Sequence, residues 1–410
     1  MSRLDELMAQ LCPEGVEYKT ISELFHTKNG YTPSKHNPRF WEGGTIPWFR
    51  MEDIRQNGPV LSDSIQHITP DAVKGELFPE NSIIVATSAT IGQHALLTCK
   101  SLANQRFTYM VLKDKWKTAF DIKFIFYYCY KLDEWCLSHL NQGNFASVDM
   151  KQFSSFRFPL LPLPVQREIV RILDNFTELT AELTAELTAR KQQYEFYRDL
   201  LLDFGESSDN GIIGSRKQEA GSRLTALRNN VYWCVLGDIA DIGTGSSNGN
   251  EAVDDGEFPF FIRSQTVKRK NEFEYDEEAI IIPGEGGIGD IFHYINGKYA
   301  LHQRVYRIHI NTAELNAKFA YYYMMANFKS YIMRKAVSAT VTSIRKPMIA
   351  TCPVPIPPLS VQRRVVRILD KFHTLCADIS EGLPAEIEAR CKQYEYYRDK
   401  LLDFPAKKAA

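Results

Sequence analysis

The chain contains two copies of one helical sequence, and this repeat limits the folds that it can adopt. Val165–Phe176 reads VQREIVRILDNF and Val361–Phe372 reads VQRRVVRILDKF, so nine of twelve positions agree at an offset of 196. Ala189–Phe204 (ARKQQYEFYRDLLLDF) and Ala389–Phe404 (ARCKQYEYYRDKLLDF) agree at twelve of sixteen positions, at an offset of 200. The second copy has therefore gained four residues between its two blocks. Such a repeat predicts a molecule built from two related halves.

Each copy is predicted to form a long helix. Proline-rich segments, 159–164 and 353–358, precede both copies and favour an extended approach to the helix. Apolar residues then recur at steps of three and four, a heptad pattern with four-residue insertions. Two matching seams predict that the helices pack on each other as an antiparallel coiled coil; the alternative is that each helix covers only its own domain. The predicted seam comprises Ile172, Phe176, Leu179, Leu183, Leu187, Ile368, Phe372, Leu375 and Ile379.

Two local features distinguish the helices. The first repeats the tetrad Thr-Ala-Glu-Leu at 180–183 and 184–187. The second contains Gly382, Leu383 and Pro384. Because proline is tolerated in the first turn of a helix but not in its interior, we expect a break near 382–384, with Pro384 in a new first turn.

The segments that precede the helices predict a pair of α+β domains with short strands, turns and one or two helices each. Both begin with a valine-led strand and a short helix, at 16–24 and 231–239, and both end in an aromatic helix around 124–128 or 319–323. Between these lie an apolar turn (46–49 or 258–261), a strand (83–85 or 280–282), a small-residue loop, and the dipeptide Gln-Arg at 105–106 or 303–304. The predicted organisation is globular domain 1–160, helix 161–204, flexible Gly/Ser-rich linker 205–222, globular domain 223–356 and helix 357–404, a pseudo-two-fold internal repeat.

Composition excludes several classes of protein. Lys and Arg total 49 against 50 for Asp and Glu, so a nucleic-acid partner would have to be bound by local basic patches. No run of about 18 apolar residues is present, and the N-terminal sequence is acidic where a secretory signal is apolar, so we expect a cytoplasmic protein without a membrane span. The eight cysteines form no C-x-x-C pair and predict neither a zinc site nor another metal site.

Two motifs resemble catalytic signatures without completing them. Gly284–Gly289 satisfies G-x-G-x-x-G, but residues 290–300 predict a strand where a dinucleotide site needs a helix. Asn37–Phe40 resembles the Asn-Pro-Pro-aromatic tetrad of adenine methyltransferases, but Arg39 replaces the second proline, so a turn is favoured. With no P-loop, nuclease core, zinc-protease or serine-hydrolase motif either, no catalytic residues and no cofactor are predicted for this chain.

The remaining candidates are residues suited to binding DNA. Arginine and lysine suit phosphates and guanine edges, glutamine suits adenine edges, and glycines allow a close approach of backbone to a groove. The alternative for each is a solvated charged surface, or for the glycines a turn with positive φ. The candidates are Lys28, Tyr31, Lys35, Arg50, Thr90, Gly92, Gln93, Arg263, Lys268, Arg269, Gly287, Gly289, Arg345 and Lys346.

The doubled plan, the sequence VQR-x-x-V-R-I-L-D-x-F, the Thr-Ala-Glu-Leu tetrads and the endings QYEFYRDLLLDF and QYEYYRDKLLDF closely resemble the specificity subunits of type I restriction-modification enzymes. The resemblance spans nearly the whole chain and is strongest in the helices. Gly30–Pro33 and Ile46–Trp48 also resemble the recurring frame of their target-recognition domains, whereas the second half keeps only Phe258–Phe260.

The resemblance implies a non-catalytic subunit that reads a bipartite, asymmetric sequence in double-stranded DNA, with one target-recognition domain for each half-site. The helix pair would act as a spacer and as the dock for two methylation subunits, with two restriction subunits that act as motors joining for cleavage. S-adenosylmethionine, ATP and Mg²⁺ would be bound by those partners. Two other classes are also consistent with the sequence: a coiled-coil scaffold that joins two protein-binding domains, and an enzyme whose active site the motifs do not reveal.

Overall fold

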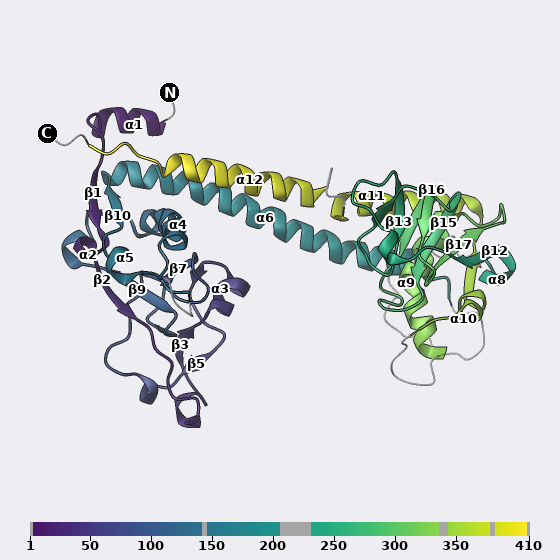
Figure 1. The fold of residues 1–410 in the computed structure, drawn as a ribbon, viewed down its shortest axis with the longest axis horizontal. Coiled ribbons are helices and arrows are strands. Elements are labelled where there is room, and N and C mark those ends of the chain that lie inside the picture. Colours follow the sequence, from purple (N-terminus) through teal and green to yellow (C-terminus); the bar gives the residue numbers. More distant parts are fainter. Residues whose placement is uncertain (1–2, 142–145, 206–230, 336–342, 378–381, 408–410) are drawn as a thin grey trace. The chain divides into compact units, whose positions relative to one another are not determined.

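The computed structural model describes residues 3–141, 146–205, 231–335, 343–377 and 382–407. The chain divides into two compact units, Met1–Glu182 with Glu388–Ala410, and Leu183–Ile387. The predicted linker 205–222 lies outside the described residues except for Gly205. Each unit therefore combines one globular domain with part of each repeated helix, as the ribbon in Figure 1 shows for each unit separately.

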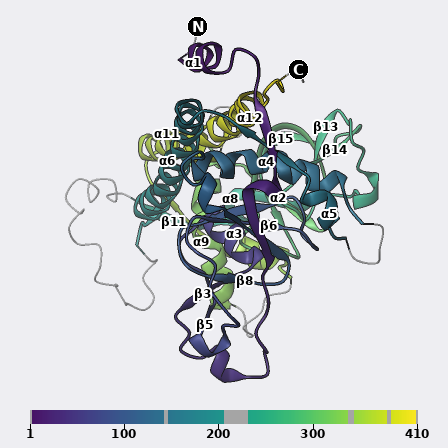
Figure 2. The same ribbon diagram turned by 90° about the vertical axis from the view of Figure 1, so that its left-hand side faces the viewer.

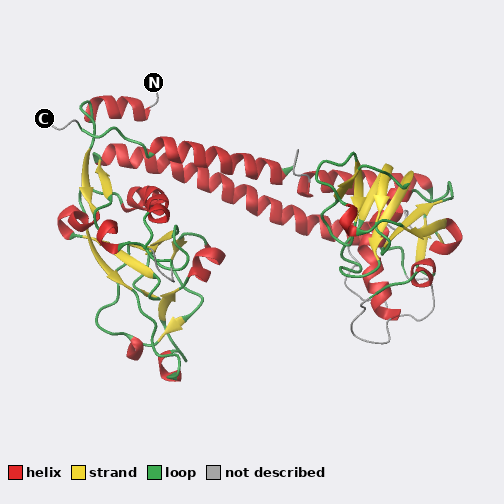
Figure 3. Cartoon of the chain, viewed as in Figure 1, coloured by secondary structure: helices red, strands yellow, loops and turns green. Residues whose placement is uncertain are grey.

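The first unit contains a five-stranded sheet of order β2-β9-β6-β7-β4, a three-stranded sheet β5-β3-β8 and the strand pair β1-β10. Figure 3 distinguishes these strands from the helices around them. The elements of its globular part are α1 (Arg3–Leu11), β1 (Glu17–Thr20), α2 (Ile21–Leu24), β2 (Phe25–Asn29), η1 (Pro38–Phe40), β3 (Ile46–Phe49), α3 (Met51–Asn57), β4 (Val60–Leu61), β5 (His67–Ile68), η2 (Pro70–Ala72), β6 (Ser82–Ala86), β7 (His94–Leu97), β8 (Leu102–Ala103), β9 (Phe107–Leu112), η3 (Asp114–Trp116), α4 (Ile122–Ser138), α5 (Met150–Phe153) and β10 (Arg157–Leu160).

The core of the first unit lies on both faces of the five-stranded sheet. Along β6, Ile83 and Val85 pack into the cluster formed with α4, whereas Ile84 and Ala86 pack into the cluster formed with β3 and β8. This alternation follows from the two-residue period of a strand. Because both faces are covered, β6 is buried at every position, which explains the apolar run from Ile83 to Ala86.

The second unit repeats this frame in a six-stranded sheet of order β12-β17-β15-β16-β13-β14, with the strand pair β11-β18 beside it. Strand β16 is nine residues long and takes the places of both β7 and β8. The elements of its globular part are β11 (Tyr232–Val235), α8 (Leu236–Ile239), β12 (Ala240–Thr244), η5 (Gly249–Glu251), β13 (Phe258–Phe261), β14 (Lys268–Lys270), β15 (Tyr275–Pro283), β16 (His293–Leu301), β17 (Val305–Ile310), α9 (Ala317–Lys335), α10 (Lys346–Ala350) and β18 (Pro353–Ile356).

The structure confirms the α+β class and corrects one local prediction. Residues 46–49 and 258–261, predicted as apolar turns, are the strands β3 and β13. Their central prolines suggested a turn, but Phe49 and Phe261 at the strand ends are buried in the core, and packing decides the conformation. Residues 290–300 include β16 rather than a helix, as predicted, and Asn37 caps the short helix η1 by accepting a hydrogen bond from the Arg39 amide at 3.3 Å.

The repeated helices are α6 (Leu163–Leu202), α11 (Leu359–Ala377) and α12 (Leu383–Leu401). Pro384 is the second residue of α12, where its missing amide hydrogen costs no helical bond. Residues 378–381, including the predicted seam residue Ile379, lie outside the described part of the chain.

The helices pack on each other within each unit. In the first, Phe176 of α6 contacts Tyr394 and Tyr397 of α12, with ring centroids 6.4 and 5.6 Å apart. In the second, Phe372 of α11 contacts Tyr194 and Tyr197 of α6 at 6.2 and 5.9 Å. The two helices of the first unit lie side by side in Figure 1 and again in the turned view of Figure 2. The alternative in which each helix covers its own domain alone is therefore wrong.

The predicted seam is only partly buried. Ile172, Leu183, Leu187 and Ile368 are half-buried, as are the two phenylalanines of the ring contacts, whereas Leu179 and Leu375 are 36% and 37% exposed. A different row of side chains faces the globular domains and is fully buried. This row comprises Val165, Ile169, Leu173, Val365 and Leu369. The helices thus use one face for their own domain and another for each other.

Candidate nucleic-acid interface

A buried glutamine fixes each repeated helix to its own domain. Gln166 is fully buried; its side chain accepts a hydrogen bond from the Asp121 amide at 2.8 Å and donates to the carbonyl oxygens of Ala119 and Leu161 at 2.8 and 2.7 Å. An amide side chain can satisfy donors and acceptors together, which an apolar residue cannot. The bonds connect the first turn of α6 to the segment that precedes α4.

Gln362 repeats this arrangement in the second unit. It is also fully buried, accepts from the Asn316 amide at 2.7 Å and donates to the carbonyl oxygens of Glu314 and Pro357 at 2.8 and 2.7 Å. The Gln shared by the two VQR sequences is therefore a structural anchor, and it sets where each helix leaves its domain.

An aspartate in each repeat adds a second anchor. Asp174 accepts hydrogen bonds from Lys123 and Tyr127 of α4, both at 2.7 Å. Asp370 accepts from Lys318 and Tyr322 of α9 at 2.9 and 2.6 Å. Burial, and next the bond to the aspartate, raise the pKa of both tyrosines, so their hydroxyl groups stay protonated donors.

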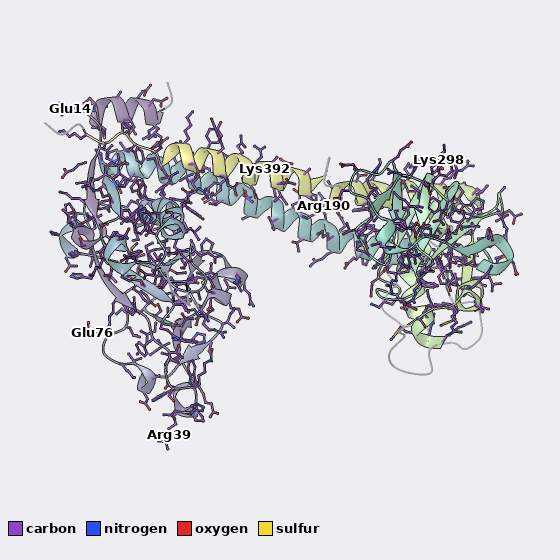
Figure 4. All side chains as sticks on the ribbon, viewed as in Figure 1. Glu14, Arg39, Glu76, Arg190, Lys298 and Lys392 are labelled. Atoms are coloured by element: carbon purple, nitrogen blue, oxygen red, sulfur yellow. The ribbon has the colours of Figure 1, made fainter. Side chains whose placement is uncertain are left out.

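The ends of α6 and α12 also repeat one arrangement. Arg198 bonds Asp199 at 2.9 and 3.0 Å, and Arg398 bonds Asp399 at 2.8 and 3.0 Å. Lys392 lies on the solvent side of α12, where it pairs with Glu388 at 2.6 Å (Figure 4).

Each helix end also leaves an aromatic pair on the surface. Phe196 and Tyr396 are 56% and 62% exposed, while Tyr197 and Tyr397 are both 38% exposed. The rings of each pair meet edge to face, with centroids 5.5 Å apart on α6 and 5.3 Å apart on α12. Aromatic residues are enriched at surfaces that bind another protein.

Several of the predicted DNA-binding residues of the first domain have structural roles. The Tyr31 hydroxyl donates to the Ala72 carbonyl at 3.2 Å and accepts from the Lys74 amide at 2.5 Å. Arg50 precedes α3 and pairs with Glu52 at 3.2 Å. Lys28 and Lys35 are exposed, and the Lys28 ammonium lies 5.8 Å from the centre of the Phe78 ring.

The small-residue loop of the first domain, residues 87–93, is a turn between β6 and β7. Thr90 and Gln93 are half-buried, and the Gln93 carbonyl accepts from the Ala86 amide at 2.8 Å. Gly92 has φ +86°, and an added Cβ would contact Leu137 of α4.

The cations of the second domain divide into paired and solvent-facing groups. Arg263 pairs with Glu285 at 3.1 Å, and Arg269 donates to the carbonyl oxygens of Gly256 and Glu257 at 2.5 and 2.7 Å. Arg269 therefore fastens β14 to the segment that leads into β13. Lys268 on β14, together with Arg345 and Lys346 at the start of α10, is exposed.

The glycines after β15 are needed for the conformation of their loop. Gly287 and Gly289 have φ +64° and +75°. An added Cβ would overlap Ile291 in the first case and Lys329 of α9 in the second. The turn with positive φ, the alternative considered from the sequence, accounts for both residues, and a fold effect of substitution is expected before any effect on a ligand.

Within the residues that the structure describes, no group of three or more His, Cys, Asp or Glu side chains is placed to bind a metal ion. None of the described helices combines the length and hydropathy needed to cross a membrane. The eight cysteines are free thiols.

Comparison with known proteins identifies the family. The family described as type I restriction modification DNA specificity domain matches residues 13–190 and 233–389, one match for each half of the repeat. The chain belongs to this family. It is 38% identical over 400 residues to the EcoprrI specificity subunit of a type I restriction enzyme from Escherichia coli, with 93% of each chain covered.

Two solved structures share the fold. The S subunit of a type I restriction-modification system from M. genitalium matches with a TM-score of 0.54 and 17% identity, covering 96% of this chain and 97% of that one. A structure that describes complex assembly and conformational transition of a type I system matches with a TM-score of 0.59 and 16% identity, covering 96% and 98%. The predicted architecture and the resemblance stated from the sequence are both confirmed.

Proposed function

We propose that this specificity protein reads a bipartite, asymmetric DNA sequence, with the domain of each unit recognising one half-site. The observation that carries the proposal is one sheet frame built twice with different side chains at its surface. The strand order β2-β9-β6-β7 recurs as β12-β17-β15-β16, and the same Gln and Asp anchors recur. The loop residues differ, as with Thr90 and Gly287. A shared core that carries different loops is the arrangement expected of two domains that recognise different DNA sequences.

Other polypeptides would catalyse the methylation and cleavage of the DNA. We propose two methylation subunits, which bring S-adenosylmethionine and methylate an adenine in each half-site, and two restriction subunits that use ATP and Mg²⁺. The near-neutral charge of the chain supports this division, because partners can supply part of the positive surface that a DNA duplex needs. A cytoplasmic location follows from a DNA target.

The exposed aromatic pairs support docking of two copies of one partner. Phe196 with Tyr197 and Tyr396 with Tyr397 recur on the ends of α6 and α12, at equivalent positions of the two units. A repeated surface of this kind fits two identical subunits, one for each unit. We propose that the methylation subunits bind there.

A map of methylated adenines in cells that carry the chain with its methylation subunit tests this function. We expect a single motif of two fixed segments separated by bases of any identity. A gel-shift assay with the chain alone and with methylation subunits, against the mapped duplex and a scrambled one, separates this function from that of a scaffold. Equal binding to both duplexes, or no binding, would favour the scaffold.

A further inference from the structure

The first domain contains a tight turn between β8 and β9 whose backbone bonds define its shape. The Asn104 amide donates to the carbonyl of Phe49 at 3.0 Å, and the Phe107 amide donates back to the carbonyl of Asn104 at 3.2 Å. The Asn104 side-chain oxygen accepts from the Arg106 amide at 2.9 Å, which closes an Asx turn. The Arg106 carbonyl accepts from the Thr87 amide at 3.0 Å, so the turn is fixed on two sides.

The second domain builds the same turn between β16 and β17 from different residues. The His302 amide donates to the carbonyl of Phe261 at 3.0 Å, and the Val305 amide donates to the carbonyl of His302 at 2.9 Å. Here the His302 Nδ1 accepts from the Arg304 amide at 3.0 Å, in the place of the asparagine oxygen. The Arg304 carbonyl accepts from the Gly284 amide at 2.9 Å.

The glutamine inside each turn holds it against the loop that follows the first sheet strand. Gln105 accepts from the Thr32 hydroxyl at 2.5 Å, and Gln303 donates to the Asn248 side-chain oxygen at 2.8 Å. These hydrogen bonds account for the presence of a glutamine at this position in both domains.

The arginines inside the turns are not explained in this way, because Arg304 bonds an acidic side chain while Arg106 has no side-chain partner among the described residues. Arg106 is exposed and makes no ion pair or side-chain hydrogen bond within the part of the chain that the structure describes. The Arg304 side chain is 55% exposed and shares the Glu285 carboxylate with Arg263, at 2.8 and 3.1 Å. Two arginines on one carboxylate leave a net positive charge at the turn. The fold therefore presents an exposed cation at the same turn position in both domains, and in the first domain no side-chain contact among the described residues requires it.

What surrounds the arginine differs between the domains. The backbone places Ser88 in the first domain where Glu285 stands in the second, since each forms an isolated bridge to a later segment, at Ser147 and Ser343 respectively. A constant cation beside a variable neighbour indicates contact with a feature that all targets share. In DNA that feature is the phosphate backbone, whereas base edges differ from site to site.

We propose that Arg106 and Arg304 are the equivalent phosphate contacts of the two domains and that the Gln-Arg turn positions each domain on the duplex. This inference rests on the proposed function, because it assumes a DNA target. A phosphate contact contributes to affinity through release of a counterion and carries no sequence information.

The test is binding of the full chain, assembled with its methylation subunits, to two duplexes followed by fluorescence anisotropy across a salt series. One duplex carries the sequence found by methylated-adenine mapping, and the other is scrambled at equal length. We expect Arg106→Ala and Arg304→Ala each to reduce the slope of log affinity against log salt by about 0.9, which is about 8-fold in affinity at about 0.1 M salt. The loss should be equal for both duplexes.

Two further variants define the control and the chemistry. Arg157→Ala removes an exposed arginine from β10 and should leave the slope unchanged. Arg106→Lys keeps a positive charge but not the paired geometry that reads guanine, so it should retain most of the slope. Thermal unfolding of each variant verifies that the fold is intact.

The possible results distinguish failure of the phosphate-contact inference from failure of the proposed DNA-reading function. An unchanged salt slope in both alanine variants, or a loss confined to the mapped duplex, would overturn the inference while the DNA-reading function stands. A wild-type assembly that binds the mapped and scrambled duplexes equally would instead overturn the proposed function.

Discussion

Replacing Gln166 with alanine should destabilise the first unit much more than the loss of a small polar side chain at the surface would. The substitution removes three hydrogen bonds to backbone groups, a buried one to the Leu161 carbonyl and two part-buried ones to the Asp121 amide and the Ala119 carbonyl. A buried polar group left without a partner costs about 1–3 kcal/mol. Because water can enter the space left by the side chain and satisfy part of this loss, we expect a total of about 3–5 kcal/mol.

This cost should be measurable as a change in unfolding of one unit. For a domain of roughly 200 residues, 1 kcal/mol lowers the Tm by about 2–4 °C, so the expected decrease is about 6–20 °C. Differential scanning calorimetry of the full chain measures it. Gln362→Ala should have a similar effect on the transition of the second unit, since its three bonds have nearly the same lengths.

The matched control is Gln192→Ala, an exposed position of the same helix, for which we expect a change within about 0.5 kcal/mol. If Gln166→Ala and Gln192→Ala lowered the Tm by the same small amount, the assignment of Gln166 as an anchor would be refuted. Retained stability in Gln166→Ala but not in Gln362→Ala would show that the two anchors are not equivalent.

Three further predictions follow from the repeat. Deleting Thr180–Leu183 shortens α6 by about 6 Å and rotates its end by about 40°, so the gap in the methylated motif should change while both half-sites persist; altered half-sites with an unaltered gap would reject a spacer role. Burial, and then the charges of two arginines including Arg304, lower the pKa of His302, so unfolding should become easier as the pH falls below about 6.5, where the unfolded chain takes up the proton first. His302→Asn should weaken that pH dependence in calorimetry, because an amide keeps the turn without titrating; equal pH dependence in wild type and variant would count against the prediction. Phe196→Ala and Tyr396→Ala should each weaken binding of one methylation subunit without lowering the Tm, as native mass spectrometry of the assembly would show, and full retention of both subunits in the double variant would exclude these surfaces as docks.

The structural features that could be predicted from the sequence are those that arise from the internal repeat or from a periodic hydropathy pattern. Helices, strands and the α+β class follow from hydropathy patterns, and the pairing of the helices follows from matching heptads. Leu173 and Leu369, which face the globular domains and are fully buried, were not predicted. A helix that packs on two sides has two rows of apolar residues, and only one row was assigned to each helix from the sequence.

Polar anchors and loop contacts could not be predicted in the same way. Gln166 and Gln362 look like surface residues of a helix, and only their recurrence in both copies indicated a shared requirement. Tyr31 and Arg269 were expected at the DNA surface but bond to the backbone of their own domain. Loop conformation decides such roles, and it depends on contacts between residues far apart in the chain, which periodicity does not encode.

The central claim is that one domain reads each half of the target, and exchange of a single domain tests it most directly. Residues 233–356 would be replaced by the corresponding residues of the E. coli relative, leaving the helices and the first domain intact. Methylated-adenine mapping in cells with the methylation subunit should then show a motif with one changed half and one unchanged half at the original gap. A motif changed in both halves, or in neither, would contradict the claim.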